Sequence, residues 1–289
     1  MKLVSLTEAS TKAFGDFEAI RILKEAGYDA IDYSMFLMQD DNHPLCRDDY
    51  KSYVREVKAY ADSLGIGFAQ GHAPFPSYRA DNMEYTKKMY PRTIRSIEIA
   101  GMLEIPYLVV HPLQVIPKDA DRLQINVEFY KSLIPYAKEY NVKLCLENMW
   151  GWDPKRNYII PDTCSWATDF AAYVDAMDSE YCVACLDLGH CGLTGEDAEN
   201  SIRVLGHDRL QALHVHDNDY HNDTHTLPYY GKMDWEGITR ALHDINYQGN
   251  LTFEADCFLT PLPKDVRLYE AGARFMQTVG RYLIEKIGL

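Results

Sequence analysis

Residues 107–148 read YLVVHPLQVIPKDADRLQINVEFYKSLIPYAKEYNVKLCLEN and contain one complete strand, helix and strand. Residues 107–110 and 142–146 are short apolar runs of the length expected for buried strands. Between them, residues 123–140 carry apolar side chains at helical spacing. A strand, a helix and a second strand in this order predict a right-handed crossover between two parallel strands.

The same alternation repeats along the whole chain. Apolar, β-rich runs occupy residues 2–6, 30–33, 66–70, 107–110, 142–146, 182–186, 210–215 and 250–253. Helical periodicity occupies residues 50–64, 83–102, 123–140, 166–177, 235–245 and 268–287. Eight such units predict an α/β fold, a (β/α)8 TIM barrel that spans residues 1–289 as one domain, because such barrels typically take about 250 residues. A doubly wound open sheet is the rival, but its usual glycine-rich phosphate-binding motifs do not occur.

The composition excludes several classes of protein. With 47% hydrophobic and 25% charged residues, the chain is neither disordered nor collagen-like. A net charge of −14 without a basic run argues against a nucleic-acid partner. No apolar stretch approaches the length of about 20 residues that a membrane helix needs, and no signal peptide is recognisable, so no membrane partner is expected. Seven irregularly spaced cysteines indicate reduced thiols and predict a cytoplasmic protein.

The ends of six consecutive predicted strands each carry a histidine, an aspartate or a glutamate. These residues are His72, His111, Glu147, Asp187 with His190, His214 with His216, and Glu254. In a (β/α)8 barrel the carboxyl ends of all strands meet at one face, where active sites lie. Burying so many ionisable groups together is unfavourable unless a cation compensates their charge. Carboxylates mixed with imidazoles suit one divalent metal ion of Mn, Co, Zn or Mg, so the sequence predicts a metal site.

Two loop segments carry further candidates. Trp150 lies three residues after Glu147, and we expect its ring to form a wall of the pocket, because a loop over a barrel mouth has little core beneath it. Asp223 and His225 have the spacing of a ligand pair, although a solvated loop explains them equally well.

Seven short segments together resemble the xylose isomerase-like barrel superfamily, in particular its sugar phosphate isomerase/epimerase branch. They are residues 71–74 (GHAP), 110–112 (VHP), 146–148 (LEN), 186–190 (LDLGH), 213–219 (LHVHDND), 227–235 (LPYYGKMDW) and 252–254 (TFE). The resemblance covers nearly the whole chain, and it lies in the order and spacing of the segments. It implies a TIM barrel that acts on a small sugar, sugar phosphate or polyol derivative.

The ketose epimerases of this superfamily hold one divalent metal ion with Glu, Asp, His and Glu. By motif position, the resemblance implies the ligands Glu147, Asp187, His214 and Glu254. His214 is preferred to His216 because the family's ligand stands three residues before an acidic residue, as His214 does before Asp217.

The other candidates are assigned to the substrate. The resemblance implies that His190, three residues after the aspartate ligand, binds a substrate oxygen, and that Asp153 replaces a second family glutamate. We also expect substrate contacts from His72, His111, Trp150 and His216. Tyr220 stands where the family carries an arginine, which allows for a substrate other than a free ketohexose.

The chain also resembles the endonuclease IV branch, whose members are three-zinc phosphodiesterases that act on abasic DNA. All nine of that branch's ligand types can be placed, at His72, His111, Glu147, Asp187, His190, His214, Asp223, His225 and Glu254. The loops that would hold DNA read MQDD at residues 38–41 and RDD at residues 47–49. Acidic loops repel a phosphate backbone, which argues against this reading and leaves one or three ions as alternatives.

These observations predict a divalent-metal-dependent isomerase or epimerase of a small sugar, sugar phosphate or polyol derivative. Glu147 and Glu254 are the expected catalytic acid and base, which move a proton through an enediolate. The alternatives are an endonuclease IV-like phosphodiesterase and a non-catalytic sugar-binding protein, since a fold does not fix a function. The expected partner is a small molecule, and a homo-oligomer is compatible with the sequence.

Overall fold

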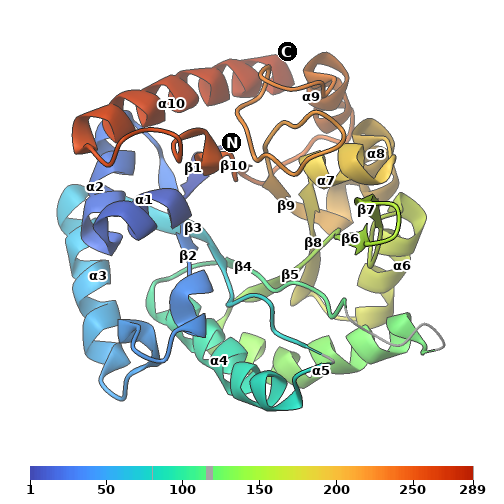
Figure 1. Ribbon diagram of the computed structural model, residues 1–289, viewed down its shortest axis with the longest axis horizontal. Helices are drawn as coiled ribbons and strands as arrows, with labels where there is room; N and C mark the ends of the chain where they lie inside the picture. Colours follow the sequence, from blue (N-terminus) through green and yellow to red (C-terminus); the bar gives the residue numbers. More distant parts are fainter. Residues whose placement is uncertain (80, 115–119, 289) are drawn as a thin grey trace.

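The computed structural model describes residues 1–79, 81–114 and 120–288, and in this part of the chain eight parallel strands form a ring (Figure 1). In ring order they are β1 (Leu3–Leu6), β2 (Ala30–Ser34), β3 (Gly67–His72), β4 (Tyr107–Val109), β5 (Lys143–Glu147), β8 (Cys182–Asp187), β9 (Leu210–His214) and β10 (Leu251–Phe253). β10 pairs with β1, and a bridge between Val215 and Phe253 closes the ring. The predicted (β/α)8 TIM barrel is confirmed, and the open doubly wound sheet is excluded.

Helices cover the outside of the barrel, as Figure 1 shows. They are α1 (Glu8–Phe14), α2 (Asp16–Ala26), α3 (Tyr50–Leu64), α4 (Met83–Met102), α5 (Arg122–Tyr140), α6 (Ala167–Met177), α7 (Leu188–Thr194), α8 (Ala198–Arg209), α9 (Trp235–Asp244) and α10 (Val266–Gly288). The described loops also contain three short 3-10 helices, η1 (Phe36–Gln39), η2 (Pro44–Cys46) and η3 (Asp256–Phe258). None of the described helices combines the length and the apolar character that a membrane-spanning segment requires.

The strands are buried on both faces, as expected for a parallel sheet surrounded by helices. On β5, Leu144 and Leu146 belong to the large core that the strands share with the helices. Cys145, which lies between them in sequence, packs instead with Cys185 of β8 in a second, smaller cluster. This alternation puts every second side chain of a strand inside the barrel. At the carboxyl end of the strands, the same alternation directs ionisable side chains toward the barrel axis.

Several elements were not predicted from the sequence. Between β5 and α6, the chain forms an antiparallel hairpin of β6 (Trp150–Asp153) and β7 (Tyr158–Pro161). The residues of β6 are only partly buried or exposed, so the apolar pattern of a core strand is absent. Helices α1 and α7 contain seven residues each, which is too short for a helical period to be recognised.

Candidate metal centre and substrate cavity

The carboxyl end of the barrel brings four ionisable side chains together. Glu147, Asp187 and His214 are the last residues of β5, β8 and β9, and Glu254 directly follows β10. All four are buried, and each offers one atom that lies within 4.8 Å of the atoms offered by the other three. The four residues that the family resemblance implied as ligands are therefore neighbours, because parallel strands of the barrel end at the same face.

His214 lies at the centre of this group. Its Nδ1 lies 3.0 Å from Oε1 of Glu147, 3.1 Å from Oε2 of Glu254 and 3.8 Å from Oδ2 of Asp187. Burial alone would lower the pKa of His214, but neighbouring groups, Glu254 and Glu147 among them, raise it well above its ordinary value. Three carboxylates around one ring nitrogen require positive charge, which a proton on His214 or a bound cation can supply.

The donor set fits a divalent metal ion. Among the described residues, Oε2 of Glu147 and Oε2 of Glu254 are buried and accept no hydrogen bond. Burial alone would raise the pKa of both glutamates. The surrounding histidines, of which His214 has the largest effect, instead lower the pKa of both well below the ordinary value. Both are therefore ionised at neutral pH, as metal ligands must be. Ionised carboxylates with an imidazole suit Mn, Co, Zn or Mg.

A second group of metal-capable atoms lies beside the first. It consists of His190, His216, Asp223 and His225, whose offered atoms also lie within 4.8 Å of one another. Nδ1 of His190 and Nδ1 of His225 each lie 2.8 Å from a main-chain carbonyl oxygen, so the main chain holds each Nδ1–H and each Nε2 faces Asp223. These Nε2 atoms lie 3.6 Å and 3.2 Å from the Asp223 carboxylate. The Asp223 and His225 pair, which the sequence left open, is thus part of the site.

His72 and His111 lie against the first group from other strands. His72 is fully buried, its Nδ1 lies 3.0 Å from Oδ1 of Asp32, and its ring stacks on His214 with ring centres 4.5 Å apart. Nε2 of His111 lies 3.0 Å from Oε2 of Glu147. Asp32 was not identified from the sequence, where its one signal is a lone charged residue within an otherwise uncharged strand.

Asn148 links the two metal-capable groups. Its side-chain Oδ1 accepts a hydrogen bond from the Asp187 N–H at 2.7 Å, and its Nδ2 donates to the Asp187 carbonyl oxygen at 2.9 Å. Its own carbonyl oxygen accepts the hydrogen bond from Nδ1 of His190. One buried residue therefore holds the end of β8 against the end of β5 and also orients the His190 ring.

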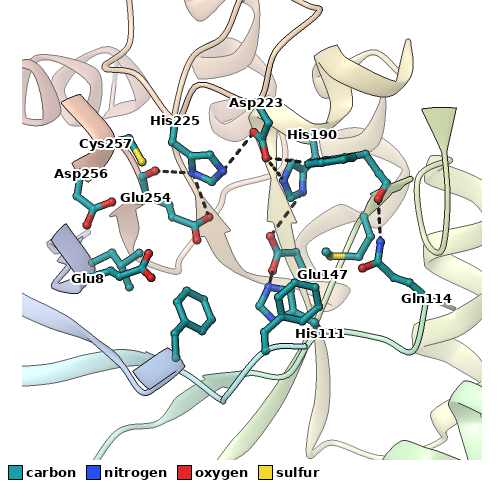
Figure 2. A pocket seen from close by; sticks show the side chains of 15 residues that line it. Glu8, His111, Gln114, Glu147, His190, Asp223, His225, Glu254, Asp256 and Cys257 are labelled. Atoms are coloured by element: carbon teal, nitrogen blue, oxygen red, sulfur yellow. Dashed lines mark hydrogen bonds and ion pairs between the residues drawn. The ribbon is translucent and has the colours of Figure 1, made fainter. Parts of the chain in front are cut away.

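A cavity of about 300 Å³ opens beside these groups (Figure 2). Its lining consists of Leu6, Glu8, Phe36, Phe75, His111, Gln114, Glu147, Met149, Trp150, His190, Asp223, His225, Glu254, Asp256 and Cys257. Figure 2 shows the Glu147 carboxylate between the rings of His111 and His190, with the Glu254 carboxylate close by. A concave site of this size, with apolar walls and a few polar groups, suits a small molecule.

Trp150 lies in the cavity wall, where the sequence analysis expected it. Its Nε1 donates a hydrogen bond to Oδ2 of Asp223 at 2.9 Å, and its carbonyl oxygen accepts one from Nε2 of Gln114 at 2.8 Å. The β6–β7 hairpin thereby holds in place the loop that carries Asp223 and His225.

Three residues that we expected to contact substrate lie behind the lining or away from it. His72 lies behind Glu254 and His214. His216 is fully buried, with Nε2 2.9 Å from Oδ1 of Asp187. Asp153 lies at the hairpin turn, where its Oδ1 accepts main-chain hydrogen bonds. His72 and His216 are thus placed to support ligands, and Asp153 to support the hairpin.

The sequence analysis missed eight of the lining residues, and five of them are Glu8, Phe36, Phe75, Asp256 and Cys257. They belong to the segments that follow β1, β2, β3 and β10. No motif in the sequence marks them, and they become neighbours only because the strand ends of the barrel meet.

The chain belongs to the xylose isomerase-like TIM barrel family, whose model matches residues 20–279. Among curated proteins, it is similar to the D-psicose 3-epimerase of Enterocloster bolteae, with 28% identity over 217 residues, 71% of this chain and 66% of that protein. It is also similar to the fructoselysine 3-epimerase of Shigella flexneri, with 25% identity over 260 residues, 87% of this chain and 88% of that protein. The chain covers 27%, 66% and 62% of the length of the first three curated relatives that it matches.

Solved structures share the fold. A D-tagatose 3-epimerase-like protein matches with a TM-score of 0.74 and 18% identity, over 99% of this chain and 100% of that one. A D-psicose 3-epimerase crystallised in the presence of D-fructose matches with a TM-score of 0.72 and 16% identity, over 98% and 99% of the two chains. The predicted membership of the xylose isomerase-like superfamily is confirmed.

Proposed function

We propose that this chain is a divalent-metal-dependent epimerase or isomerase of a small sugar or polyol derivative. The observation that carries the proposal is the pair Glu147 and Glu254, two ionised carboxylates from separate strands that line one cavity and share contact with His214. Two such carboxylates can act on a substrate between them, one as general base in its ionised form and the other as general acid after it has taken up a proton from solvent.

Glu147, Asp187, His214 and Glu254 would hold the metal ion. Bound there, the ion would polarise a substrate carbonyl and stabilise the negative charge that develops on its oxygen. His216 holds the Asp187 carboxylate from behind through its Nε2. His190 turns its Nε2 toward the cavity, where it can contact a substrate oxygen.

Glu147 and Glu254 would move the proton. One carboxylate accepts the proton from the carbon next to the carbonyl, so that the C–H bond breaks and its electron pair forms the enediolate. The other carboxylate takes up a proton from solvent and donates it to restore a C–H bond, and the first carboxylate then releases its proton to solvent. Donation to the opposite face of the same carbon gives an epimer, whereas donation to the adjacent carbon gives an isomer. Phe36, Phe75 and Trp150 give the cavity around this reaction an apolar surface.

The similar proteins support this proposal and favour epimerisation. Two of them are a D-psicose 3-epimerase and a fructoselysine 3-epimerase by name, and their matches extend over 71% and 87% of this chain. We accordingly propose a role in carbohydrate metabolism. A cytoplasmic location follows as a further proposal from the seven irregularly spaced cysteines.

Exchange of substrate hydrogen with solvent tests the proposal. Ketoses are incubated in D2O with metal-loaded protein, and deuterium should enter at a carbon next to the carbonyl. Exhaustive chelation should stop the exchange, and Mn²⁺ or Co²⁺ should restore it. Sugar binding without exchange would identify a non-catalytic binding protein. Full exchange after chelation would exclude the metal-dependent mechanism.

A phosphodiesterase with three metal ions is the second candidate. It is favoured by the group of His190, Asp223 and His225, which offers a second set of ligands beside the first. The net charge of −14 is unfavourable for binding a phosphate backbone. Elemental analysis distinguishes the candidates. About one ion per chain supports the epimerase, whereas three tightly held ions together with incision of an abasic-site duplex support the phosphodiesterase.

A further inference from the structure

The side of the cavity formed by the segments after β1 and β10 is acidic. Glu8, the first residue of α1, and Asp256, in η3, both line the cavity there. Figure 2 shows both residues on the same side of the cavity as Glu254, with Gln114 on the opposite side. Within residues 1–79, 81–114 and 120–288, neither lysine nor arginine lines the cavity.

Both carboxylates are held in place by α1. Oδ2 of Asp256 accepts a hydrogen bond from the Ala9 N–H at 2.6 Å, and Asp256 is 4% exposed. Oε1 of Glu8 lies 2.5 Å from Nζ of Lys12, one helical turn further on. The Lys12 side chain is 55% exposed and does not line the cavity. The Glu8 side chain therefore faces the cavity, and the Lys12 ammonium group does not. Water screens such an exposed pair and weakens the neutralisation.

The first turn of α1 is also closed to an added anion. Main-chain N–H groups at a helix N-terminus commonly bind phosphate in barrel enzymes. In α1 the Ala9 N–H already donates to Asp256, and the Glu8 carboxylate occupies the first turn. A phosphate placed there would meet the Glu8 carboxylate and the buried Asp256 side chain, which already accepts the Ala9 N–H.

The adjoining part of the cavity is apolar. It is formed by Leu6, Phe36 and Phe75, and the Phe75 ring lies 4.2 Å from the His111 ring, centre to centre. Apolar walls keep water away from charges inside the cavity, so repulsion between like charges is screened less than on an open surface. The same aromatic faces can pack against the C–H groups of a sugar.

We infer that the cavity accepts an uncharged sugar and rejects sugars that carry a phosphate, and that Glu8 determines this specificity. The inference rests on the proposed function and specifies its substrate class as an unphosphorylated ketose or polyol derivative. Binding of a phosphate ester normally uses arginine, lysine or free main-chain N–H groups. The described lining offers neither lysine nor arginine, and its imidazoles, those of His111, His190 and His225, already lie against the carboxylates of Glu147 and Asp223.

Calorimetric binding tests the inference. Metal-loaded wild-type protein is titrated with ketohexoses and ketopentoses, each paired with its terminal phosphate ester. The dissociation constant of the phosphate ester should be larger by a factor on the order of 100, because like charges would be buried together. Higher salt should narrow this ratio, since repulsion between charges is screened. A ratio caused by the size of the phosphate would not change with salt.

Two variants separate the role of Glu8 from a general effect of charge. Glu8→Gln keeps the size of the side chain and removes its charge. It should lower the ratio of the dissociation constants of phosphate ester and free ketose by about 10-fold. Asp62→Asn is the matched control. It breaks the pair of Lys58 and Asp62, which is also an i,i+4 ion pair on a helix but lies outside the cavity, and it changes the net charge equally. This control should leave the ratio unchanged.

The outcomes distinguish the inference from the proposed function. Tighter binding of the phosphate ester than of the free ketose overturns the inference and leaves the proposed reaction standing. The inference is also overturned if neither salt nor Glu8→Gln changes the ratio of the two dissociation constants. It is overturned as well if the protein binds none of the ketoses and none of their phosphate esters. Selective binding of the free ketose without solvent exchange supports the inference and removes the proposed reaction.

Discussion

Replacing Asn148 with leucine is expected to lower both the stability of the barrel and its affinity for a divalent metal ion. Asn148 is 1% exposed, and leucine has a similar size. The change removes the acceptor for the Asp187 N–H and the donor to the Asp187 carbonyl oxygen. The N–H then lacks its partner, whereas the carbonyl oxygen still accepts a hydrogen bond from the Cys191 thiol at 3.4 Å.

The magnitude follows from these contacts. One buried N–H without a partner costs about 1 to 3 kcal/mol, and one lost hydrogen bond about 0.5 to 1.5 kcal/mol. The free energy of unfolding should therefore fall by about 2 to 4 kcal/mol, and the melting temperature of a chain of this length by roughly 3 to 7 °C. Metal affinity should fall about 10- to 100-fold, because Asp187 and His190 lose the residue that positions them.

Thermal unfolding and calorimetric titration with Mn²⁺ measure the two effects separately. Asn126→Leu is the matched control, because Asn126 is also buried and its side chain makes the same pair of hydrogen bonds with the main chain of Leu113, at 2.7 and 3.3 Å. It should lower stability with little effect on metal affinity. Equal metal affinity in the two variants would refute the positioning role of Asn148, and an unchanged melting temperature would refute the burial argument.

Three further predictions follow from the site. Glu147→Gln and Glu254→Gln should each lower turnover by roughly 10²- to 10⁴-fold, and near-normal turnover in either variant at full metal occupancy would exclude the two-carboxylate mechanism. Removal of the metal ion by chelation should lower the free energy of unfolding by about 2.7 kcal/mol, relative to protein in a free metal concentration of 100 times the dissociation constant. Denaturation with and without chelator measures this difference. Burial, together with the nearby Glu8 carboxylate, raises the pKa of Asp256 to about 7. The folded protein therefore holds this proton more tightly than the unfolded chain, and the stability present below about pH 4 is lost as the pH rises to about 7. Asp256→Asn keeps an acceptor for the Ala9 N–H, so denaturation at pH 5 and pH 8 should show a smaller loss in the variant, and equal losses would contradict the raised pKa.

The barrel and the ionisable residues at its strand ends could be predicted because both depend on local patterns, and the family resemblance then singled out four of these residues. A strand that is buried on both faces has to be apolar along its length, so each strand is visible in the sequence. Glu147 and Asp187 end their strands, and all parallel strands of a barrel end at one face. Their proximity therefore required no knowledge of contacts between distant segments. The β6–β7 hairpin escaped prediction because its residues are not fully buried and its pairing lies outside the barrel.

The roles of the individual histidines depend on contacts that no local pattern contains. His214 and His216 are two residues apart, and strand alternation would direct both to the same face. β9 ends at His214, although Val215 still pairs with Phe253. His214 faces the Glu147 and Glu254 carboxylates, whereas His216 turns to Asp187 and stacks on His225.

The sequence alone was enough to predict the barrel and the face that carries the site, because strand periodicity and strand direction are properties of short segments. The shape and charge of the cavity depend on residues far apart in the chain. Glu8 and Asp256 are separated by nearly the whole sequence, and they line one wall because β1 pairs with β10. Asp32 meets His72 because β2 pairs with β3. Such neighbours arise when the barrel closes, and side-chain packing between strands then fixes which atoms face the cavity.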